Sequence, residues 1–259
     1  CKNIISLDIP SGIYSDTGTS AGCYVKAKFT LTFSYPKLGL YINDGRDASG
    51  SVNIIDIGLS KISEKNEYIN IINKNDIENK HIQTSKNIHK YNNGRVIMIS
   101  GAQSYSGATI LASKAVINTG VGILKILVPK SIYSIVENSL FEAITIPLED
   151  YNIGFLSDAN VESIRKYIPW SDAVLFGPGL VCPDSKWMAN ILCDISKPLV
   201  LDASGFSPII DRHIEINDLP KNTILTPHYA EFSKLFNIDI NDLNINPINI
   251  LKNIIKDLD

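Results

Sequence analysis

The sequence predicts an α/β protein in which short buried strands alternate with helices. An apolar run of strand length, Arg95–Ser100, leads through a glycine-bearing turn into Gly107–Gly120, where small and apolar residues recur at helical spacing. The same alternation continues toward the C-terminus of the 259-residue chain. Hydrophobic residues make up 44% of the sequence and charged residues 20%, which is typical of a chain with a substantial core. We therefore expect a mostly parallel sheet with helices on both faces.

Three apolar runs near the N-terminus are predicted to be strands, because proline and glycine fall between them. These runs are Asn3–Asp8, Lys28–Phe33 and Val52–Leu59, and the turns that separate them contain IPSG and SYPKLG. The runs are too short for helices of ordinary length, which favours strands.

A domain boundary is predicted after these strands. From Ser60 to Asn87 the composition shifts to Lys, Asn, Glu and isolated Ile without a sustained period, although Tyr68–Ile72 also fits a short strand or helix. We therefore expect a domain over residues 1–60, a linker over 61–88 and a second domain over 89–259.

From Gly94 onward the pattern alternates between strands and helices. Strands are expected at Arg95–Ser100, Ile123–Val128, Ala173–Phe176, Pro198–Asp202 and Thr223–Leu225. Helices are expected at Gly107–Thr119, Ile132–Leu140, Asn160–Tyr167, Ser185–Cys193 and Ala230–Leu235, and the closing segment INILKNIIKDLD is amphipathic.

Several candidate site residues closely follow predicted strands. Gly101, Gly177, Asp202 and the Pro227-His228 pair each do so. Parallel strands end at the same edge of a sheet, and ligands of such sheets gather there. We expect these residues to converge on one edge.

Charge and cysteine usage exclude several classes of protein. The net charge of -3 gives no reason to expect nucleic acid or an anionic membrane as a partner. The four cysteines lack CxxC spacing, which argues against a zinc site or a disulfide framework and favours a reduced, cytoplasmic compartment. No apolar stretch reaches membrane-spanning length, and the N-terminus lacks the pattern of a signal peptide.

Both ends of the sequence resemble cuts in a longer polypeptide. The chain begins with Cys1 rather than Met, and a predicted strand follows almost at once. Its last residues lie inside the predicted amphipathic helix, with no glycine to cap it. We therefore expect additional sequence on both sides.

The turn between Arg95–Ser100 and the following helix is a candidate anion site. Gly101 and Gly107 are expected to remove side chains where the backbone turns, so that the helix-opening amides face an anion. The turn matches neither GxGxxG nor GxxxxGK[ST]. An ordinary strand-to-helix turn is the alternative.

Three further motifs follow predicted strands. FGPGL places Gly177 and Gly179 around a proline, which allows close approach of backbone to a ligand, or simply makes a rigid turn. LDASG ends a strand with the Asp202 carboxylate, whose alternative role is to cap the next segment. TPHYAEF places His228 three residues before Glu231. Glu231 would then orient the His228 imidazole toward a substrate, and the alternative is that the pair only caps a helix.

The N-terminal part offers a smaller set of polar residues. LDIPSG supplies Asp8 at a strand end and Ser11 in the following turn, and their oxygens suit a hard cation or a polar substrate. A proline turn with a capping aspartate is the alternative. Lys37 in YPKLG either pairs with an anionic group or is solvated.

Taken together, the order and spacing of these motifs resemble the YjeF family of bifunctional NAD(P)HX repair enzymes. In that family an NAD(P)HX epimerase domain is fused to an ADP- or ATP-dependent NAD(P)HX dehydratase domain. Five segments resemble the end of the epimerase domain: LDIPSG, DTG, TFSYPKLGL, GRDASG and IDIGL. Six later segments resemble successive dehydratase motifs: HKYNNGR, SYSGA, INTGVG, FGPGL, LDASG and TPHYAEF. The resemblance implies the C-terminal part of a Rossmann-like epimerase domain, followed by a ribokinase-like three-layer α/β domain.

The resemblance also implies roles for residues at matching positions. Asp8 would contact the hydrated nicotinamide, Ser11 would help to ligate a potassium ion, and Lys37 would lie nearby. The NAD(P)HX pocket of the second domain would be lined by Ala108, Gly177, Gly179 and His228, with Asp202 and Glu231 in support. The implied cofactors are ADP or ATP with Mg²⁺, and a homo-oligomer is an expectation from the family.

The chain departs from the family pattern at several points. Val181 stands where the family usually has another glycine, and LDASGF differs from its usual DAD run. The glycine- and asparagine-rich loop of the epimerase and the GxGD turn that carries the dehydratase's catalytic aspartate are not within the sequence. We therefore expect residues 1–259 alone to be inactive in both reactions.

Two other functions fit parts of the pattern. A ribokinase-like kinase acting on a sugar or a vitamin precursor would share the sheet and the glycine turn, but it has no reason to carry LDIPSG and YPKLG upstream. A remnant that binds nucleotide without turnover is the non-enzymatic alternative, since the abundance of Ile, Asn and Lys is compatible with drift in an AT-rich genome.

Overall fold

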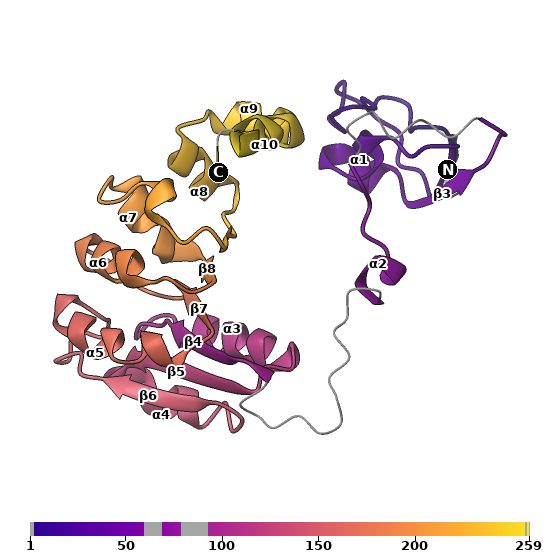
Figure 1. The fold of residues 1–259 in the computed structure, drawn as a ribbon. Helices are drawn as coiled ribbons and strands as arrows, with labels where there is room; N and C mark the ends of the chain where they lie inside the picture. The colour runs from indigo at the N-terminus through magenta and orange to yellow at the C-terminus, as the bar shows by residue number, and fades with distance from the viewer. Residues whose placement is uncertain (1–2, 60–68, 79–92, 257, 259) are drawn as a thin grey trace. The chain divides into compact units, whose positions relative to one another are not determined.

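A computed structural model of the chain describes residues 3–59, 69–78, 93–256 and 258 (Figure 1). Contacts divide the chain into two compact units. The small unit comprises Cys1–Ile82 with Asp239–Asn253, and the large unit comprises Gln83–Ile238 with Ile254–Asp259. The domain division expected from the sequence stays a prediction, because most of the expected linker lies outside the described residues.

The small unit contains a three-stranded parallel sheet in the order β1-β2-β3. Its strands are β1 (Ile5–Leu7), β2 (Phe29–Phe33) and β3 (Ser51–Ile55). Its helical segments are η1 (Leu38–Leu40), α1 (Asn43–Ala48), α2 (Lys74–Glu78), α9 (Ile240–Ile245) and the greater part of α10 (Pro247–Lys256). The three expected strands and the amphipathic C-terminal helix are therefore confirmed.

The third strand of the small unit is shorter than expected. It ends at Ile55, whereas the apolar pattern continues to Leu59. The Asp56 Oδ1 atom accepts a hydrogen bond from the Gly58 amide at 2.8 Å, and Gly58 adopts a left-handed φ of 78°. This local side-chain-to-backbone bond competes with the strand and ends it.

The large unit contains a six-stranded sheet in which every neighbouring pair is parallel. The strand order is β6-β5-β4-β7-β8-β9. The strands are β4 (Arg95–Ile99), β5 (Ile123–Pro129), β6 (Ile144–Leu148), β7 (Ala173–Phe176), β8 (Leu199–Leu201) and β9 (Thr223–Leu225). The mostly parallel sheet predicted from the alternating pattern is confirmed.

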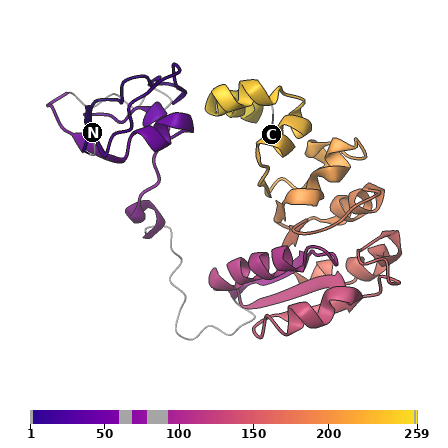
Figure 2. The same cartoon turned by 180° about the vertical axis from the view of Figure 1, so that it is seen from behind.

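Helices cover both faces of this sheet (Figures 1 and 2). The α-helices are α3 (Ser106–Asn118), α4 (Tyr133–Glu137), α5 (Val161–Arg165), α6 (Lys186–Asp194), α7 (Ser207–Ile210) and α8 (Tyr229–Phe236). The 3₁₀ segments are η3 (Lys130–Ile132), η4 (Asp158–Asn160), η5 (Ile168–Trp170), η6 (Ala203–Phe206) and η7 (Ile216–Asp218). No helix within the described residues is long and apolar enough to cross a membrane.

One strand was not predicted, and the reason is physical. β6 contains Pro147, and a proline inside an apolar run counts against a strand because it cannot donate to the ladder. β6 lies at the edge of the sheet, where only one side of the strand is paired, so the proline is tolerated there. The expected helix Ile132–Leu140 is divided between η3 and α4 and ends at Glu137.

Two hydrophobic clusters hold the sheet from its two faces. In β4, Ile97 and Ile99 belong to the cluster formed with α5, α6 and α7, whereas Met98 belongs to the cluster formed with α3 and α4. All three side chains are fully buried. Successive side chains of a strand point to opposite faces of the sheet, so β4 contributes to both clusters and lies at the centre of the core.

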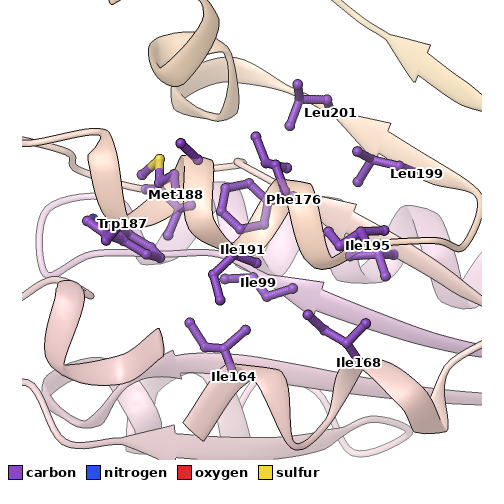
Figure 3. Packing of buried hydrophobic residues seen from close by; sticks show 14 of the residues in the cluster. Ile99, Ile164, Ile168, Phe176, Trp187, Met188, Ile191, Ile195, Leu199 and Leu201 are labelled. Carbon is purple, nitrogen blue, oxygen red and sulfur yellow. The ribbon is translucent and has the colours of Figure 1, made fainter. Parts of the chain in front are cut away.

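Phe176, the last residue of β7, anchors the larger cluster (Figure 3). Its ring is fully buried, and its centroid lies 6.2 Å from that of Trp187 in α6, with the planes tilted by 49°. Aromatic pairs in this range add to the stability gained from burial alone. This packing fixes the backbone immediately before Gly177.

We predict that Phe176→Ala lowers the free energy of unfolding by about 3–5 kcal/mol, because it opens a cavity in a well-packed core. Urea unfolding followed by tryptophan fluorescence measures the change. The control is Phe141→Ala, since the Phe141 side chain is 88% exposed and its loss leaves no cavity. Equal midpoints for the two variants would contradict the packing described here.

Candidate functional site

The strand order reverses between β4 and β7. The chain runs outward from β4 through β5 to β6, returns to β7, and continues through β8 to β9 on the other side. In open parallel sheets, ligands bind outside the carboxyl ends of the strands at such a reversal. Here the Gly101 amide donates to the Pro178 carbonyl at 3.0 Å, and the Gly177 amide donates to the Ile99 carbonyl at 3.1 Å. The two loops are therefore in direct backbone contact.

Glycine is required at the turns that form this junction. Gly101 has a φ of 89°, and a Cβ there would lie 2.6 Å from the Thr109 hydroxyl. Gly177 has a φ of 121°, and a Cβ there would lie 1.8 Å from the Asp202 carbonyl oxygen. These conformations and distances exclude a side chain. Bare backbone from three loops consequently meets at the β4–β7 junction.

The FGPGL turn also contacts the start of α3. Gly179 has a φ of 67°, and a Cβ there would lie 2.8 Å from the Tyr105 carbonyl oxygen and 3.1 Å from the Ala108 Cβ. The short side chain of Ala108 is thus placed against the turn. Gly179 and Ala108, which lie 71 positions apart in the sequence, share one surface.

The expectation that the backbone turns at Gly107 is wrong. It is the second residue of α3 and has no left-handed φ, and a Cβ placed on it would meet nothing within 4 Å. No backbone turn or neighbour therefore requires glycine there. The open space and the absence of a side-chain hydrogen bond at the N-cap, Tyr105, leave the first turn of α3 accessible.

Asp202 joins β8 to this junction and to β9. Its amide donates to the Phe176 carbonyl at 3.0 Å, and its Oδ1 atom accepts a hydrogen bond from the Thr226 hydroxyl at 2.6 Å. Nearby, the Ser204 hydroxyl donates to the Leu180 carbonyl at 2.7 Å. Thr226 and Ser204 were not selected from the sequence, since each finds its partner on another loop and carries no local signal.

His228 is the N-cap of α8. Its Nδ1 atom accepts hydrogen bonds from the amides of Ala230 and Glu231 at 3.2 and 3.3 Å, and its own amide donates to Glu231 Oε2 at 3.0 Å. Because an Nδ1 that accepts hydrogen bonds carries no proton, the ring proton is on Nε2. Nε2 lies 3.4 Å from Glu231 Oε1, and the His228 side chain is 68% exposed. The capping arrangement is present, and the second nitrogen still faces solvent.

The structure brings together most of the residues selected in the second half of the chain. Ala108, Gly177, Gly179 and Asp202 are linked by the contacts above, and His228 follows Thr226 by two residues at the end of the neighbouring strand. Asp8, Ser11 and Lys37 belong to the small unit and form a separate group. We call the surface shared by the large-unit residues the crevice.

In the small unit, Asp8 and Lys37 form an ion pair. Asp8 has a left-handed φ of 67°, and its Oδ1 atom also accepts hydrogen bonds from the Thr32 hydroxyl at 3.2 Å and from the Phe33 amide at 3.3 Å. The Lys37 ammonium donates to Asp8 and to the Thr32 hydroxyl, so the alternative of a merely solvated lysine is wrong. Ser11 is exposed, and its carbonyl accepts a hydrogen bond from the Val25 amide at 2.9 Å.

The hydrogen bond from the Lys37 ammonium holds the pKa of Asp8 below its ordinary value of 3.8, although partial burial opposes this. The backbone amide of Phe33 lowers it further. The carboxylate of Asp8 is therefore ionised throughout the neutral range. Its ionised form stabilises the fold above pH 3.8, and this contribution is lost as the pH falls through the lowered pKa.

Comparison with known proteins decides the family. The family model described as NAD(P)H-hydrate dehydratase matches residues 96–258, which contain the whole crevice. The chain belongs to the NAD(P)H-hydrate dehydratase family. A second model, the YjeF-related protein N-terminus, matches residues 1–39, which contain the Asp8–Lys37 pair.

Curated relatives match almost the whole chain. It is 31% identical to the bifunctional NAD(P)H-hydrate repair enzyme Nnr of Dictyoglomus turgidum over 98% of this chain and 50% of the relative. It is 29% identical to the corresponding enzyme of Salinibacter ruber over 89% of this chain and 44% of the relative. The chain thus spans about half the length of the curated relatives it matches.

A solved structure confirms the fold class. The chain is similar in fold to a ribokinase-like superfamily protein from Enterococcus faecalis. The TM-score is 0.55 at 21% sequence identity, and the match covers 67% of this chain and 61% of the other. The ribokinase-like α/β architecture expected from the resemblance is therefore confirmed.

We predict opposite effects for two glycine substitutions at the crevice. Gly177→Ala is expected to cost at least about 2 kcal/mol of stability, because it adds a Cβ against the Asp202 carbonyl at a left-handed φ. Gly107→Ala is expected to gain about 0.5–1 kcal/mol, since it replaces glycine in an open helical position. Chemical denaturation of both variants checks the difference. A Gly177→Ala protein as stable as the unchanged chain would contradict the junction geometry.

We also predict that the pKa of the Asp8 carboxyl, measured from its ¹³C chemical shift, lies below 3.8. In Lys37→Met the pKa is expected to rise, because the ammonium donor is removed while the partial burial remains. Lys26→Met serves as a control, since Lys26 is exposed and makes no hydrogen bond or ion pair to Asp8. An unchanged Asp8 pKa in Lys37→Met would show that this ion pair does not form in solution.

Proposed function

We propose that the crevice binds NAD(P)HX, the hydrated form of NAD(P)H, and that the chain is part of an enzyme that repairs this damaged nucleotide. The observation that carries the proposal is the contact of Ala108, Gly179, Gly177 and Asp202 where the strand order reverses. Parallel α/β sheets bind nucleotides at this place. The match of the dehydratase family model to the same segment supports the identity of the ligand.

The crevice suits a phosphate-bearing ligand because it presents backbone rather than side chains. The first turn of α3 is uncapped by a side chain, and Gly107 leaves the approach to it open. Amides at a helix N-terminus favour negative charge. Gly179 and Ala108 add a surface of small residues beside the exposed Tyr105 side chain, and the rest of the ligand rests on this surface.

His228 contributes a polar contact to this proposal. Its Nδ1 atom is occupied by the cap of α8, so the Nε2–H group is the part of the ring that is available to a ligand. Glu231 lies 3.4 Å from that nitrogen and favours the tautomer with the proton on Nε2. His228 therefore orients substrate as a hydrogen-bond donor.

The proposed chemistry is a nucleotide-dependent dehydration. ADP or ATP would supply the phosphoryl group for the misplaced hydroxyl of the hydrate, leaving AMP or ADP, and elimination of that phosphate together with a proton of the neighbouring ring carbon would restore the nicotinamide ring. Within the crevice, the chain's own groups bind and orient the phosphates and the hydrate. We assign the catalytic base to no residue of this sequence, because the expected GxGD aspartate is not among its residues.

The crevice also fits the Mg²⁺ that accompanies such nucleotides. Among the described residues, no three His, Cys, Asp or Glu side chains gather to hold a metal ion by themselves. Nucleotide-bound Mg²⁺ needs only one or two protein carboxylates, since phosphates and water supply the other ligands. Asp202, held by Thr226 at the crevice, is the carboxylate placed to approach it.

For the small unit we propose a role in NAD(P)HX epimerisation. The Asp8 carboxylate, kept ionised by Lys37, would contact the hydrated nicotinamide. The resemblance to the family implies a potassium ion at Ser11, and this ion belongs to the same proposal. The match of the YjeF-related N-terminal model to residues 1–39 supports this assignment over a ribokinase-like small-molecule kinase.

The remaining expectations belong to the same proposal. The partners of the protein are NAD(P)HX and an adenine nucleotide, without nucleic acid or membrane. We place the protein in the cytoplasm as a homo-oligomer, as expected for a soluble metabolic enzyme of this family.

His228→Asn tests the proposal without removing the helix cap. Asparagine is a favoured N-cap residue, so stability is expected to be retained, but its shorter side chain cannot replace the Nε2–H donor. We expect NADHX to bind about tenfold more weakly, which corresponds to the loss of one hydrogen bond of about 1.4 kcal/mol. Isothermal titration calorimetry of the 259-residue chain measures the affinity.

The matched control is His213→Asn, because His213 is exposed and lies outside the crevice. It is expected to bind NADHX like the unchanged chain. If His228→Asn binds NADHX with unchanged affinity, or if the unchanged chain binds no NADHX, the proposed role of the crevice is wrong.

A further inference from the structure

A second cavity lies beside the edge strand β6, separate from the crevice. Its volume is about 580 Å³, within the usual range of small-molecule sites. It is lined by residues of β6, the loop that follows it, η4 and the segment from α5 to Tyr167. None of the residues that form the crevice lines this cavity.

Lys166 gives the cavity an unpaired positive charge. Among the residues that the structure describes, no hydrogen bond or ion pair involves its ammonium group, and the neighbouring Ser163 hydroxyl also has no partner. The carboxylate at the rim, Glu149, is already paired with Lys130 at 2.6 Å. The Asn160 side chain is likewise occupied, since its amide nitrogen donates to the Glu149 carbonyl at 2.8 Å. The available groups therefore favour an anion.

Two tyrosine rings give the cavity an aromatic surface. Tyr151 is 71% exposed, whereas Tyr167 is half-buried, packs against the core and has the Lys125 ammonium 5.8 Å from its ring centroid. Neither hydroxyl makes a hydrogen bond within the described part of the chain. Pro147 and Leu148 add apolar surface from β6. A planar ring can stack on such a surface.

Tyr151 lines the cavity in a strained backbone conformation. Tyr151 and Asn152 have consecutive left-handed φ values of 48° and 64°. The buried Asp150 carboxylate fixes this conformation by accepting hydrogen bonds from the amides of Ser131 and Asn152 at 3.3 and 3.4 Å. Strained backbone of this kind is concentrated at functional sites.

We propose that this cavity binds a mononucleotide, a ligand that joins an aromatic ring to a phosphate group. The Lys166 ammonium and the Ser163 hydroxyl bind the phosphate, and the exposed ring of Tyr151 stacks on the base, with Tyr167 forming the floor beside it. This site is additional to the crevice, and it requires neither turnover nor NAD(P)HX.

The loop that follows β6 carries Tyr151 at the cavity and, three residues later, Gly154 against the β4–α3 turn of the crevice. The Gln103 amide donates to the Gly154 carbonyl at 2.8 Å, and Gly101 lies two positions before Gln103. Gly154 has a φ of 80°, and a Cβ there would lie 2.7 Å from Gln103 Oε1. A ligand that contacts Tyr151 therefore acts on a loop that is packed against the turn at Gly101.

The test is the binding of AMP to the 259-residue chain, followed by amide chemical shifts and calorimetry. We expect shift changes at Ser163, Lys166 and Tyr167, and at least tenfold weaker binding in Lys166→Met and in Tyr151→Ala. Lys186→Met is the matched control, because Lys186 is an exposed lysine on α6 that does not line the cavity. It is expected to bind AMP like the unchanged chain.

Two further probes identify the part of the ligand that is recognised. Nicotinamide mononucleotide carries a different base, and its affinity relative to AMP shows which ring the tyrosines prefer. Inorganic phosphate is expected to bind at least tenfold more weakly than AMP, since it cannot use the rings.

The proposal is overturned if both substitutions leave AMP binding unchanged, or if phosphate binds as tightly as AMP. It is also overturned if the shift changes occur only at Gly177 and Gly179, since AMP then occupies the crevice alone. Thermal unfolding of each variant shows that its fold is retained. Because NADHX is not used, failure here leaves the proposed function untouched.

Discussion

Backbone packing at the junction of β4 and β7 is the constraint on which the large unit depends. The Gly101 amide bonds to the Pro178 carbonyl, and Gly177 lies against the Asp202 carbonyl at a distance that no Cβ permits. Loops that follow three different strands can meet only because side chains are missing at these points. The crevice therefore presents peptide groups, and peptide amides are the groups that recognise phosphate most generally.

Two buried core residues fix the backbone at the start of the junction loops. Ile99 and Phe176 end β4 and β7, and both are fully buried immediately before the turns. Beyond the strands, the Ser204 hydroxyl ties the β8 loop to the Leu180 carbonyl, and the Thr226 hydroxyl ties the β9 loop to the Asp202 carboxylate. A site placed on rigid elements and closed by short hydrogen bonds keeps its geometry when the ligand arrives.

The sequence predicted five of the six strands of the large unit, including β9 at one edge of the sheet, but it missed β6 at the other edge. The bounds of β7 and β9 agree with the expectation, because short apolar runs between glycine, proline and polar residues leave few alternatives. β6 was missed because Pro147 counts against a strand in the interior of a sheet. The sequence does not show that this strand lies at the edge, where proline is tolerated. Likewise, Thr226 and Ser204 depend on partners from other loops, which no local pattern contains. Glycines after strands were recognisable, yet only the structure separates Gly177, which a neighbour requires, from Gly107, which none requires.

The capping role and the binding role of His228 are compatible, because they use different atoms of the ring. The sequence left these two roles as alternatives. In the structure, Nδ1 accepts the two amides that open α8, which fixes the ring and leaves the proton on Nε2. A solvated histidine would lose rotamer freedom when it binds a ligand, whereas this ring is already held. Helix capping thus orients the donor, and a substitution that keeps the cap but removes the Nε2–H group separates the two contributions.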